Sequence, residues 1–465
     1  MKSTLLRKYI GDKSFYKYVF AITLPIMLQN GIMQFVNMLD NIMVGRVGTT
    51  PMTGVAVSNQ LIFVFNLCIF GAVSGAGIFG AQFYGKGDTD GMRYTFRFKI
   101  YLAIFLLVVA IPFLFFCGDA LIGAFLTGGG QEVDPKMALT YAKQYLDIML
   151  IGLVPFALIQ VYSSSLRETG ETVLPMKAVL VAVLVNLTLN YVLIFDHFGH
   201  KGLGVRGAAI ATVISRFVEL AIVVIWTHRH KARNAFIVDV YKSPYIPFSL
   251  SKKIFAKGLP LMLNETFRSA GNTMLNQCYS VKGVDVVAAS NISQTFWNVF
   301  SVSFISIGTA IGIIIGQLLG AGKFEEAKDT DRKLIAFSVV ISILIGAVYF
   351  GTAFFVPHFY NTELAVRELA TGLMCISACA MPLSAFAHAS YFTLRSGGKV
   401  IVTFLFDSVF VWMVCVPTAF ALTRYTALGI LFIYTVIQAL ELIKCILGAI
   451  LLKRGIWVRN IVESD

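Results

Sequence analysis

The chain has 465 residues, of which 57% are hydrophobic and only 14% are charged, and its mean hydropathy is +0.76. Soluble domains carry about 25% charged residues, so a water-soluble fold would have no core large enough for these apolar side chains. Residues 100–116 and 334–356 approach or exceed the roughly 17–25 apolar residues that cross a bilayer. The composition therefore excludes a soluble protein and predicts an all-α integral membrane protein.

The net charge of +13 suggests a nucleic-acid partner, but the positions of the charges indicate another cause. Of the 38 Lys and Arg residues, 28 lie in the N-terminal segment and in alternate loops on the same predicted side. The positive-inside rule places this side, with both termini, in the cytoplasm. We therefore expect basic residues that contact anionic lipid, no nucleic-acid partner, and a multi-pass protein of a prokaryotic-type plasma membrane, or cell inner membrane.

The hydropathy pattern predicts twelve spans. The first is interpreted as a retained helix and not a signal peptide, because no small-residue cleavage site follows a short apolar core. In chain order, the spans are residues 18–44, 53–80, 95–117, 138–165, 172–195, 204–227, 254–280, 286–317, 334–356, 366–394, 400–422 and 427–452.

The first span carries polar residues on one helical face, which we expect to look into the bundle and not toward lipid. Amides on such a face can form a hydrogen-bonded seam that has no transport role. A buried carboxylate differs, because without a fixed cation it takes up a proton or another cation, as an ion-coupled carrier requires. The face consists of Asn30, Gln34, Asn37, Asp40 and Asn41.

The fifth and sixth spans add further polar positions. Asn186 and Asn190 lie one turn apart, so their amides could donate to a carboxylate or offer carbonyls to Na⁺, although a purely structural role is equally open. Arg216 and Glu219 are spaced i,i+3 in the sixth span and predict a structural ion pair.

An internal repeat divides the chain. A polar, basic, proline-containing segment at 228–253 predicts a cytoplasmic linker between an N-lobe, residues 1–227, and a C-lobe, residues 254–465. Each lobe has six spans, so both enter the membrane in the same orientation, and transport sites commonly lie between such parallel repeats. A shift of 235 residues matches Phe20 with Phe255, Leu24 with Leu259, Pro25 with Pro260, Met27 with Met262, Gln82 with Gln317 and Gly85 with Gly320.

The second half contains its own candidates. Glu265 is a possible ion site, but Arg268 follows at i,i+3 and could neutralise it. Asp407 is a lone acid in the eleventh span, with function and packing both open. His388 could titrate near neutral pH, although a packed histidine is the more common case.

Motifs for catalysis and metal binding were not found. The sequence has no phosphate loop, GxSxG or HExxH, and its seven cysteines form no CxxC pair. Glu441 and Lys444, at i,i+3 in the last span, predict a structural pair. We therefore expect no enzyme, no cofactor and no metal site.

Several motifs together resemble the MATE (multidrug and toxic compound extrusion) transporters of the MOP superfamily, over essentially the whole chain. They are LDNIMVGRVG (39–48), AQFYGKGD (81–88), LRETGETVLPMKA (166–178), VNLTLNYVLIF (185–195), GVRGAAIATVISR (204–216) and GQLLGAGKFEEA (316–327). The resemblance implies twelve helices in two six-helix lobes that form a V-shaped cleft. It also implies export of organic cations and other xenobiotics in exchange for Na⁺ or H⁺.

The resemblance also implies roles for individual residues. Asp40 matches the family's first-helix cation or proton site, which Asn186, Asn190 and Thr212 complete. Family members with aspartate in place of Asn190 have been linked to proton coupling. Pro25 matches a helix-1 proline that is associated with bending.

A second family site uses a helix-7 glutamate with a helix-10 aspartate. Glu265 approximately matches the helix-7 glutamate. The matching stretch of span 10, CISACAMPLSAFAHASYFTL, has no acid, so Asp407 or His388 would have to substitute.

We therefore interpret the chain as a secondary-active antiporter, expected to be monomeric, with a small cationic or amphipathic substrate and H⁺ or Na⁺ as the coupling ion. Two alternatives stay open. One is a flippase-like exporter of a lipid-linked or anionic metabolite. The other is a membrane enzyme or receptor, for which the sequence offers neither a paired catalytic constellation nor a large soluble domain.

Overall fold

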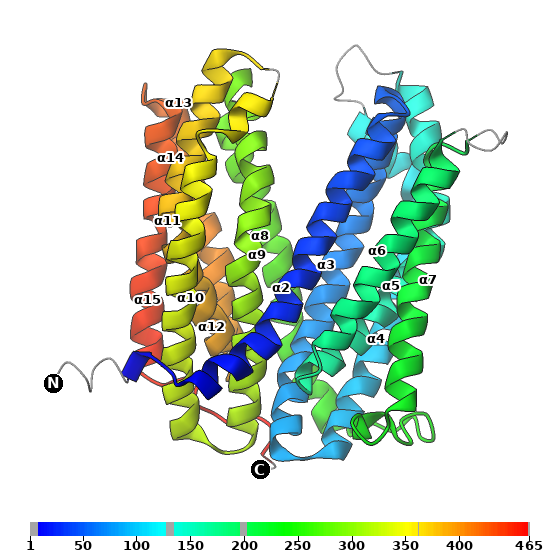
Figure 1. The fold of residues 1–465 in the computed structure, drawn as a ribbon, viewed down its shortest axis with the longest axis vertical. Helices are drawn as coiled ribbons and strands as arrows, with labels where there is room; N and C mark the ends of the chain where they lie inside the picture. Colours follow the sequence, from blue (N-terminus) through cyan, green and yellow to red (C-terminus); the bar gives the residue numbers. More distant parts are fainter. Residues whose placement is uncertain (1–7, 127–133, 196–201, 361, 464–465) are drawn as a thin grey trace. The chain divides into compact units, whose positions relative to one another are not determined.

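The computed structural model describes residues 8–126, 134–195, 202–360 and 362–463. These residues form helices joined by short connections, and no strand occurs among them (Figure 1). Eleven of the described helical segments are long and apolar enough to cross a membrane. The predicted seventh span is also helical, as α8 (Phe248–Ser280), but its many polar residues make it much less apolar than the others. The predicted all-α fold class is confirmed.

The helices separate into two compact units. Unit 1 is built from the residues up to Met27, Ala81–Asp88 and the residues from Leu263 onward. Unit 2 is built from Leu28–Gly80 and Thr89–Met262. The division into N-lobe, linker and C-lobe at residues 227 and 254 stays a prediction.

Unit 2 consists mainly of the helices between the first and seventh predicted spans. Within it α5 packs against α4 and α7, and α6 packs against α7. The helices that contribute are the second half of α2 (Lys13–Gly45), most of α3 (Thr49–Lys86), α4 (Thr89–Leu126), α5 (Pro135–Glu168), α6 (Val173–Ile194), α7 (Val205–Arg229), the short η1 (Ala235–Ile237) and the start of α8.

Unit 1 is arranged around α11, which packs against α9, α10, α14 and α15. Its core is aliphatic and aromatic, as expected for helices that face one another inside a bundle. The helices are the second half of α8, α9 (Val284–Gly320), α10 (Phe324–Thr352), the short η2 (Val356–Phe359), α11 (Leu364–Ser396), α12 (Val400–Phe404), α13 (Val416–Tyr425), α14 (Ile430–Ala439) and α15 (Glu441–Lys453).

The eleventh span contains two π-helical turns. Between α12 and α13 the helix widens at η3 (Leu405–Val409) and again at η4 (Val411–Cys415), so Val400–Tyr425 crosses as one irregular helix. Single π-turns inside α-helices are rare overall, and those that occur are often found at functional sites. Asp407 lies in the first of them.

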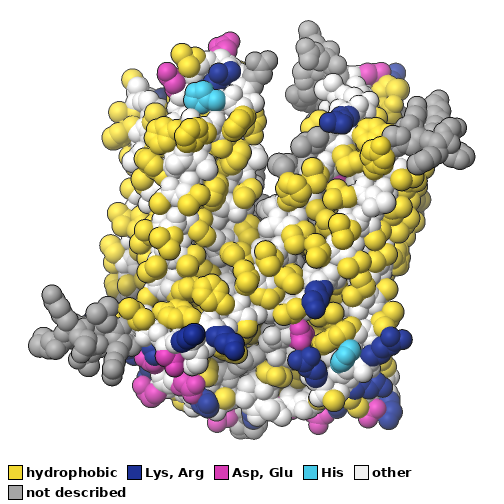
Figure 2. Space-filling view, viewed as in Figure 1, with side chains coloured by type: hydrophobic (Ala, Val, Ile, Leu, Met, Phe, Trp, Pro, Cys, Tyr) yellow, Lys and Arg dark blue, Asp and Glu magenta, His cyan; other side chains and the backbone are white. Residues whose placement is uncertain are grey.

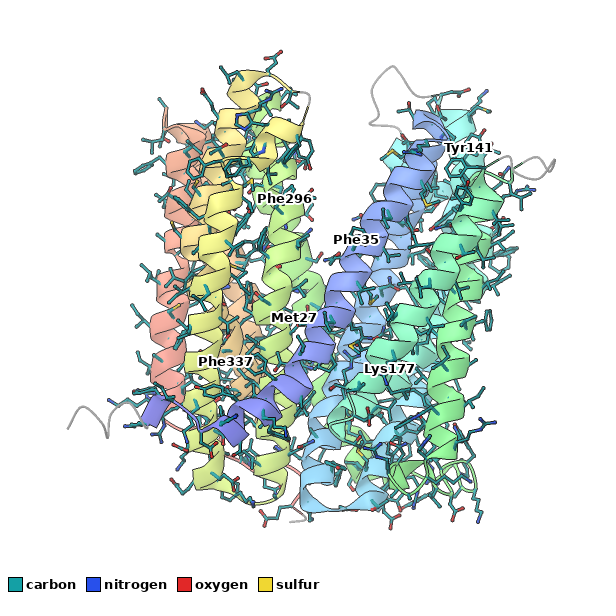
Figure 3. All side chains as sticks on the ribbon, in the orientation of Figure 1. Met27, Phe35, Tyr141, Lys177, Phe296 and Phe337 are labelled. Atoms are coloured by element: carbon teal, nitrogen blue, oxygen red, sulfur yellow. The ribbon has the colours of Figure 1, made fainter. Side chains whose placement is uncertain are left out.

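The first helix of each repeat changes units at an equivalent position. Helix α2 passes from unit 1 to unit 2 after Met27, and α8 passes from unit 2 to unit 1 after Met262. These methionines match in the 235-residue repeat, and each follows a proline by two residues. The first half of α2 thus belongs to the core of unit 1, where the ring of Phe337 on α10 lies 5.3 Å from that of Phe20 (Figure 3).

The repeat motifs AQFYGKG and GQLLGAG meet each other in unit 1. A Cβ atom on Gly85 would lie 1.9 Å from the carbonyl oxygen of Gln317, and one on Gly320 would lie 1.9 Å from that of Gln82. Each of these two equivalent glycines therefore packs directly against the backbone of the glutamine in the other repeat. The side chain of Gln82 also binds the C-terminal tail, because the backbone N–H of Ile461 donates to its Oε1 at 2.8 Å.

The connection between α7 and α8 is held by a buried arginine. The guanidinium of Arg97 on α4 donates to the carbonyls of Val240 at 2.6 Å, Asp239 at 3.0 Å and Tyr245 at 3.0 Å. One α4 side chain thereby satisfies three carbonyls of a segment that has little regular structure of its own.

The distribution of side chains on the surface fits a membrane environment. Figure 2 shows hydrophobic side chains along the middle of the helices and charged side chains gathered at their ends. The aromatic residues Phe105, Phe115 and Phe116 on α4 are all exposed, as lipid-facing residues would be.

A close helix crossing in unit 2 gives a first prediction. A Cβ atom on Gly75 of α3 would lie 2.3 Å from the Cα of Gly258 on α8, whereas a Cβ on Gly258 would come no nearer than 3.8 Å to Gly75. Gly75→Ala should therefore lower the free energy of unfolding by about 1–3 kcal/mol, because backbone atoms must move apart.

Gly258→Ala is the matched control and should be neutral or slightly stabilising, because alanine favours a helix over glycine. Thermal unfolding of the two detergent-solubilised variants measures the difference. Equal melting temperatures of the two variants would contradict the prediction that only a side chain at Gly75 clashes with the facing helix.

Candidate functional site

A chain of polar side chains links three helices of unit 2 around Asp40. Asp40, in the second half of α2, is half-buried and accepts a hydrogen bond at 2.7 Å from Nδ2 of Asn190. Asn190 Nδ2 also donates to Asn186 Oδ1 at 3.1 Å, and Asn186 Nδ2 donates to Thr212 Oγ1 on α7 at 3.4 Å. The structure thus brings together the four residues that the sequence singled out, and their role in ion coupling stays a prediction.

The carboxylate of Asp40 has an amide partner but no fixed cation. No Lys or Arg of the described residues lies within ion-pair distance of it. Arg216 acts on Asp40 and Glu219 only through longer-range electrostatics. The Arg216 guanidinium is itself held elsewhere, by the carbonyl of Gly152 at 3.2 Å and over the ring of Phe156.

The cluster offers oxygen ligands. Besides the Asp40 carboxylate, it contains the amide oxygens of two asparagines and the hydroxyl of Thr212. Oδ1 of Asn190 is buried and has no hydrogen-bond partner among the described residues. Oxygen atoms of this kind coordinate Na⁺, and the carboxylate alone can take a proton. The described residues include no group of three or more His, Cys, Asp or Glu that could hold a metal ion.

Other predicted residues of the first helix have different surroundings. Pro25 is buried within α2, at the end of its unit 1 half, and Gln34 is exposed. The side chains of Asn37 and Asn41 lie outside the described residues. Of the polar face predicted on this helix, the structure therefore describes the side chains of Asn30, Gln34 and Asp40.

Unit 1 holds a second cluster, in which carboxylates and cations alternate. Arg268 lies 2.8 Å from Glu265 and 3.6 Å from Asp407. Lys444 on α15 lies 3.5 Å from Asp407 and 3.3 Å from Glu441. Two of the three i,i+3 pairs expected from the sequence are present, and Asp407 on η3 joins them into one chain. The third prediction is wrong, because Arg216 binds the Gly152 carbonyl and forms no ion pair with Glu219.

Neutral side chains complete this second cluster. Asn264 Nδ2 donates to Asp407 at 3.1 Å and to the hydroxyl of Tyr391 at 3.2 Å, while Ser408 Oγ donates to the Asn264 side chain at 2.6 Å. His388 packs among aromatic rings, 5.4 Å from that of Phe304. Asp407 is thus held by side chains of two other helices, α8 and α15, and His388 has the surroundings of a packed residue.

A buried ion pair in unit 2 was missed at the sequence level. Lys99 Nζ on α4 lies 2.6 Å and 2.7 Å from the two carboxylate oxygens of Glu168 on α5, and it also donates to Ser165 at 3.0 Å. Its side chain is fully buried. Lys99 lies near the start of the predicted span 95–117 and Glu168 lies just beyond the predicted span 138–165, so the sequence gave no sign that the two side chains face each other.

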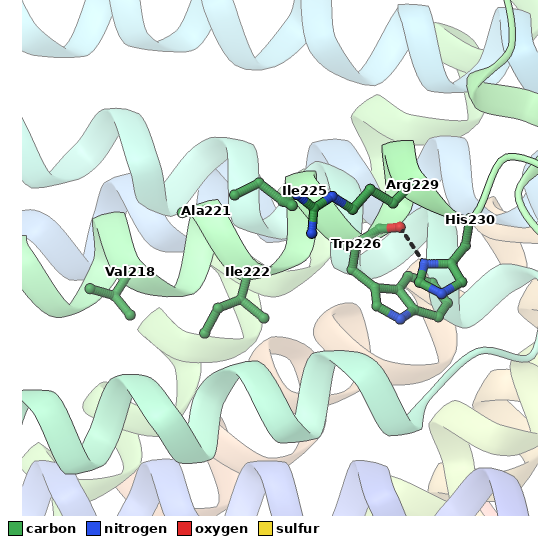
Figure 4. Close-up of a pocket in the computed structure, with 7 residues that line it drawn as sticks. All are labelled: Val218, Ala221, Ile222, Ile225, Trp226, Arg229 and His230. Carbon is green, nitrogen blue, oxygen red and sulfur yellow. Dashed lines mark hydrogen bonds between the residues drawn. The ribbon is translucent and has the colours of Figure 1, made fainter.

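An apolar hollow on unit 2 is lined by none of the residues of the Asp40 cluster. It encloses about 440 Å³ along one face of α7, and its residues run from Val218 to His230 (Figure 4). At its end the ring of His230 stacks on Trp226, and His230 Nδ1 is 2.9 Å from the Trp226 carbonyl oxygen. Such a mixture of apolar, indole and basic side chains is typical of the membrane–water interface.

Long apolar helices in a duplicated arrangement, with polar and charged clusters inside the spans, define an integral membrane protein of the transporter class. Comparisons with known proteins give the family. The model of the MatE family matches residues 25–192 and 260–421, which is most of the chain. The chain belongs to the MatE family, and the resemblance seen in its motifs is confirmed.

Individual relatives cover nearly the whole length. The chain is 26% identical over 480 residues to the probable multidrug resistance protein NorM of Thermotoga maritima, covering 99% of this chain and 98% of that protein. It is 24% identical over 432 residues to the probable multidrug resistance protein YoeA of Bacillus subtilis, covering 90% and 89%.

Solved structures share the fold. One is described as an outward-facing multidrug resistance MATE family transporter of the MOP superfamily, with a TM-score of 0.84, 18% identity and 97% of each chain covered. Another, from Pyrococcus furiosus, is described as a MOP superfamily transporter with a binding pocket of reverse polarity, with a TM-score of 0.80, 19% identity and 97% of each chain covered.

The buried Lys99–Glu168 pair gives a second prediction. Lys99→Met leaves the Glu168 carboxylate buried without its cation, so the free energy of unfolding should fall by about 3–5 kcal/mol. The double variant Lys99→Met/Glu168→Gln removes both charges and should recover most of that loss. Chemical or thermal unfolding of the single and double variants measures the coupling.

The exposed pair Lys143–Asp119, with about half of each side chain accessible, is the control. Lys143→Met should change the free energy of unfolding by less than ~1 kcal/mol. If the losses of unfolding free energy from Lys99→Met and from Glu168→Gln simply add in the double variant, the two charges act independently, which would contradict the prediction.

Proposed function

We propose that this protein is a secondary-active antiporter that exports organic cations and other xenobiotics in exchange for H⁺ or Na⁺. The observation that carries the proposal is the Asp40 carboxylate, which is held by the amide of Asn190 and has no fixed cation among the described residues. A charge inside a membrane protein must be neutralised, so this one draws its partner from the solution.

Coupling follows from competition for that carboxylate. In an outward-open state, Asp40 takes up H⁺ or Na⁺ and a cationic substrate leaves. In an inward-open state, it releases the ion and is free to bind substrate again. The two ligands need the same negative charge, so the binding of one weakens the other.

The substrate class follows from the same chemistry. A cationic amphipathic molecule satisfies a carboxylate with its charge, and aromatic and methionine side chains with its apolar part. The 39 Phe and 15 Met residues of the chain are compatible with such a ligand. The relatives from Thermotoga maritima and Bacillus subtilis are both named as probable multidrug resistance proteins, which supports this class.

The proposal includes a location and an assembly. The chain lies in a prokaryotic-type plasma membrane with both termini in the cytoplasm, as its loop charges indicate. It works as a monomer, because one chain contains both repeats. It needs no cofactor besides the coupling ion.

A second candidate is the export of a lipid-linked or anionic metabolite. The fixed cations Arg268 and Lys444 in unit 1 favour it. The three carboxylates of the same cluster outnumber them, so a cationic substrate remains the main proposal.

The test is substrate efflux from proteoliposomes under separately imposed Na⁺ and H⁺ gradients, with ethidium as the trial substrate. One of the gradients should drive efflux by the unaltered chain. Asp40→Asn should remain folded and lose at least about tenfold of this rate, which corresponds to ~1.4 kcal/mol of lost ion interaction.

The matched control is Asp119→Asn, which makes the same chemical change at an exposed acid and should leave efflux unchanged. Undiminished efflux by a folded Asp40→Asn protein would refute the role of Asp40. If neither gradient drives ethidium efflux by the unaltered chain, an anionic test substrate should replace ethidium, and its transport would favour the second candidate.

A further inference from the structure

The ammonium group of Lys444 lies in a cage that resembles a binding place for a free cation. Asp407 and Glu441 each place a carboxylate oxygen within 3.5 Å of Nζ, and the ring of Phe410 lies 5.4 Å away. Only 7% of the lysine side chain is accessible. Carboxylates with an aromatic face are a chemical environment that suits a monovalent cation of ammonium size.

All three carboxylates of this cluster already have fixed partners. Lys444 forms ion pairs with Asp407 and Glu441, and Arg268 forms ion pairs with Glu265 and Asp407. Asp40 in unit 2 has only an amide. The two clusters therefore differ: the acids around Asp407 have cations attached to the chain, whereas Asp40 has an open position.

We propose that Lys444 is a tethered cation that permanently fills a monovalent-cation site in unit 1. The carboxylates Asp407 and Glu441 consequently exchange no ion with the solution while the lysine is present. Lys444 thereby determines whether these two acids are open to small cations. The proposal goes beyond the proposed function, because it concerns the binding of ions to unit 1 and holds whether or not the protein exports xenobiotics.

The proposal makes a gain-of-binding prediction. Without Lys444, three carboxylates would face one remaining cation, Arg268, in partly dehydrated surroundings. Such an imbalance is strongly unfavourable, so the site should recruit a cation from solution. Lys444→Ala also removes the aliphatic stem, which leaves room for a small alkylammonium ion to take the place of the lost side chain.

A merely structural ion-pair network would behave differently. It would lose stability in Lys444→Ala, but no small cation would restore that stability in a saturable way. Restoration by a free cation thus distinguishes a filled binding site from a structural salt bridge.

The test measures thermal unfolding of the full-length chain in detergent. All proteins carry Asp40→Asn, so that the unit 2 carboxylate does not contribute. Ethylammonium chloride, NaCl and KCl each replace choline chloride at constant ionic strength, which keeps charge screening constant. In Lys444→Ala, ethylammonium should raise the melting temperature by about 2–4 °C in a saturable manner.

Two proteins serve as controls. The Asp40→Asn parent should shift by less than 1 °C, roughly the resolution expected for this measurement. Lys453→Ala removes an exposed lysine from the same helix and should behave like the parent. Adding Asp407→Asn to Lys444→Ala should abolish the response, because it removes a carboxylate of the cage.

If Lys444→Ala does not fold, Lys444→Ala/Glu441→Gln carries the test. It keeps Asp407 open while restoring the parent's balance of one excess negative charge in the cluster. A smaller saturable rise is then expected, because the cage keeps the Asp407 carboxylate and has lost that of Glu441. The proposal is overturned if either variant folds and its melting temperature does not rise with ethylammonium. It is also overturned if the Asp40→Asn parent, with Lys444 in place, shows an equally large rise that Asp407→Asn removes.

Discussion

The structure depends on one constraint: a charge within the apolar part of a membrane protein must be neutralised close by. Lys99 and Glu168 meet it by pairing in the interior of unit 2. Glu265, Asp407 and Glu441 meet it in unit 1 with Arg268 and Lys444. The charge of Asp40 is only partly compensated, by a hydrogen bond from a single amide. A carboxylate such as Asp40, whose neutralisation within the protein is incomplete, is a place at which an exchangeable ion can act.

Close backbone contact is the second physical basis of the fold. Glycine lets α3 approach α8 in unit 2, and equivalent Gly–Gln contacts join the two repeats in unit 1. Lipid tails are as apolar as aliphatic side chains, so helix association in a membrane depends on such tight packing. The exchange of α2 and α8 between units at Met27 and Met262 follows the same repeat symmetry. Duplication therefore governs the backbone, even where the side chains have diverged.

That divergence gives the two units different chemistry. The cluster around Asp40 has spare oxygen ligands, including the buried Oδ1 of Asn190. The cluster around Asp407 has its cations covalently attached, on a helix widened by a π-turn. A transporter with one open and one filled acidic site would couple export through a single carboxylate. Attached cations would still keep the second cluster ordered, since each holds helices together.

The sequence by itself determined the all-helical membrane class, the repeat and the polar residues of the first, fifth and sixth spans. These are consequences of composition and local periodicity, which need no knowledge of distant contacts. It also paired Glu265 with Arg268 and Glu441 with Lys444, because i,i+3 neighbours share one helix face. The same spacing at Arg216 and Glu219 gives no ion pair, because Arg216 binds a carbonyl of α5. Only the tertiary structure showed that Asp407 joins these two pairs and that Lys99 faces Glu168. It also gave the hydrogen bond from Asn190 to Asp40, which the sequence indicated only through the family resemblance. Such contacts link residues between 37 and 150 positions apart, so they depend on which helices pack together and which faces they turn inward.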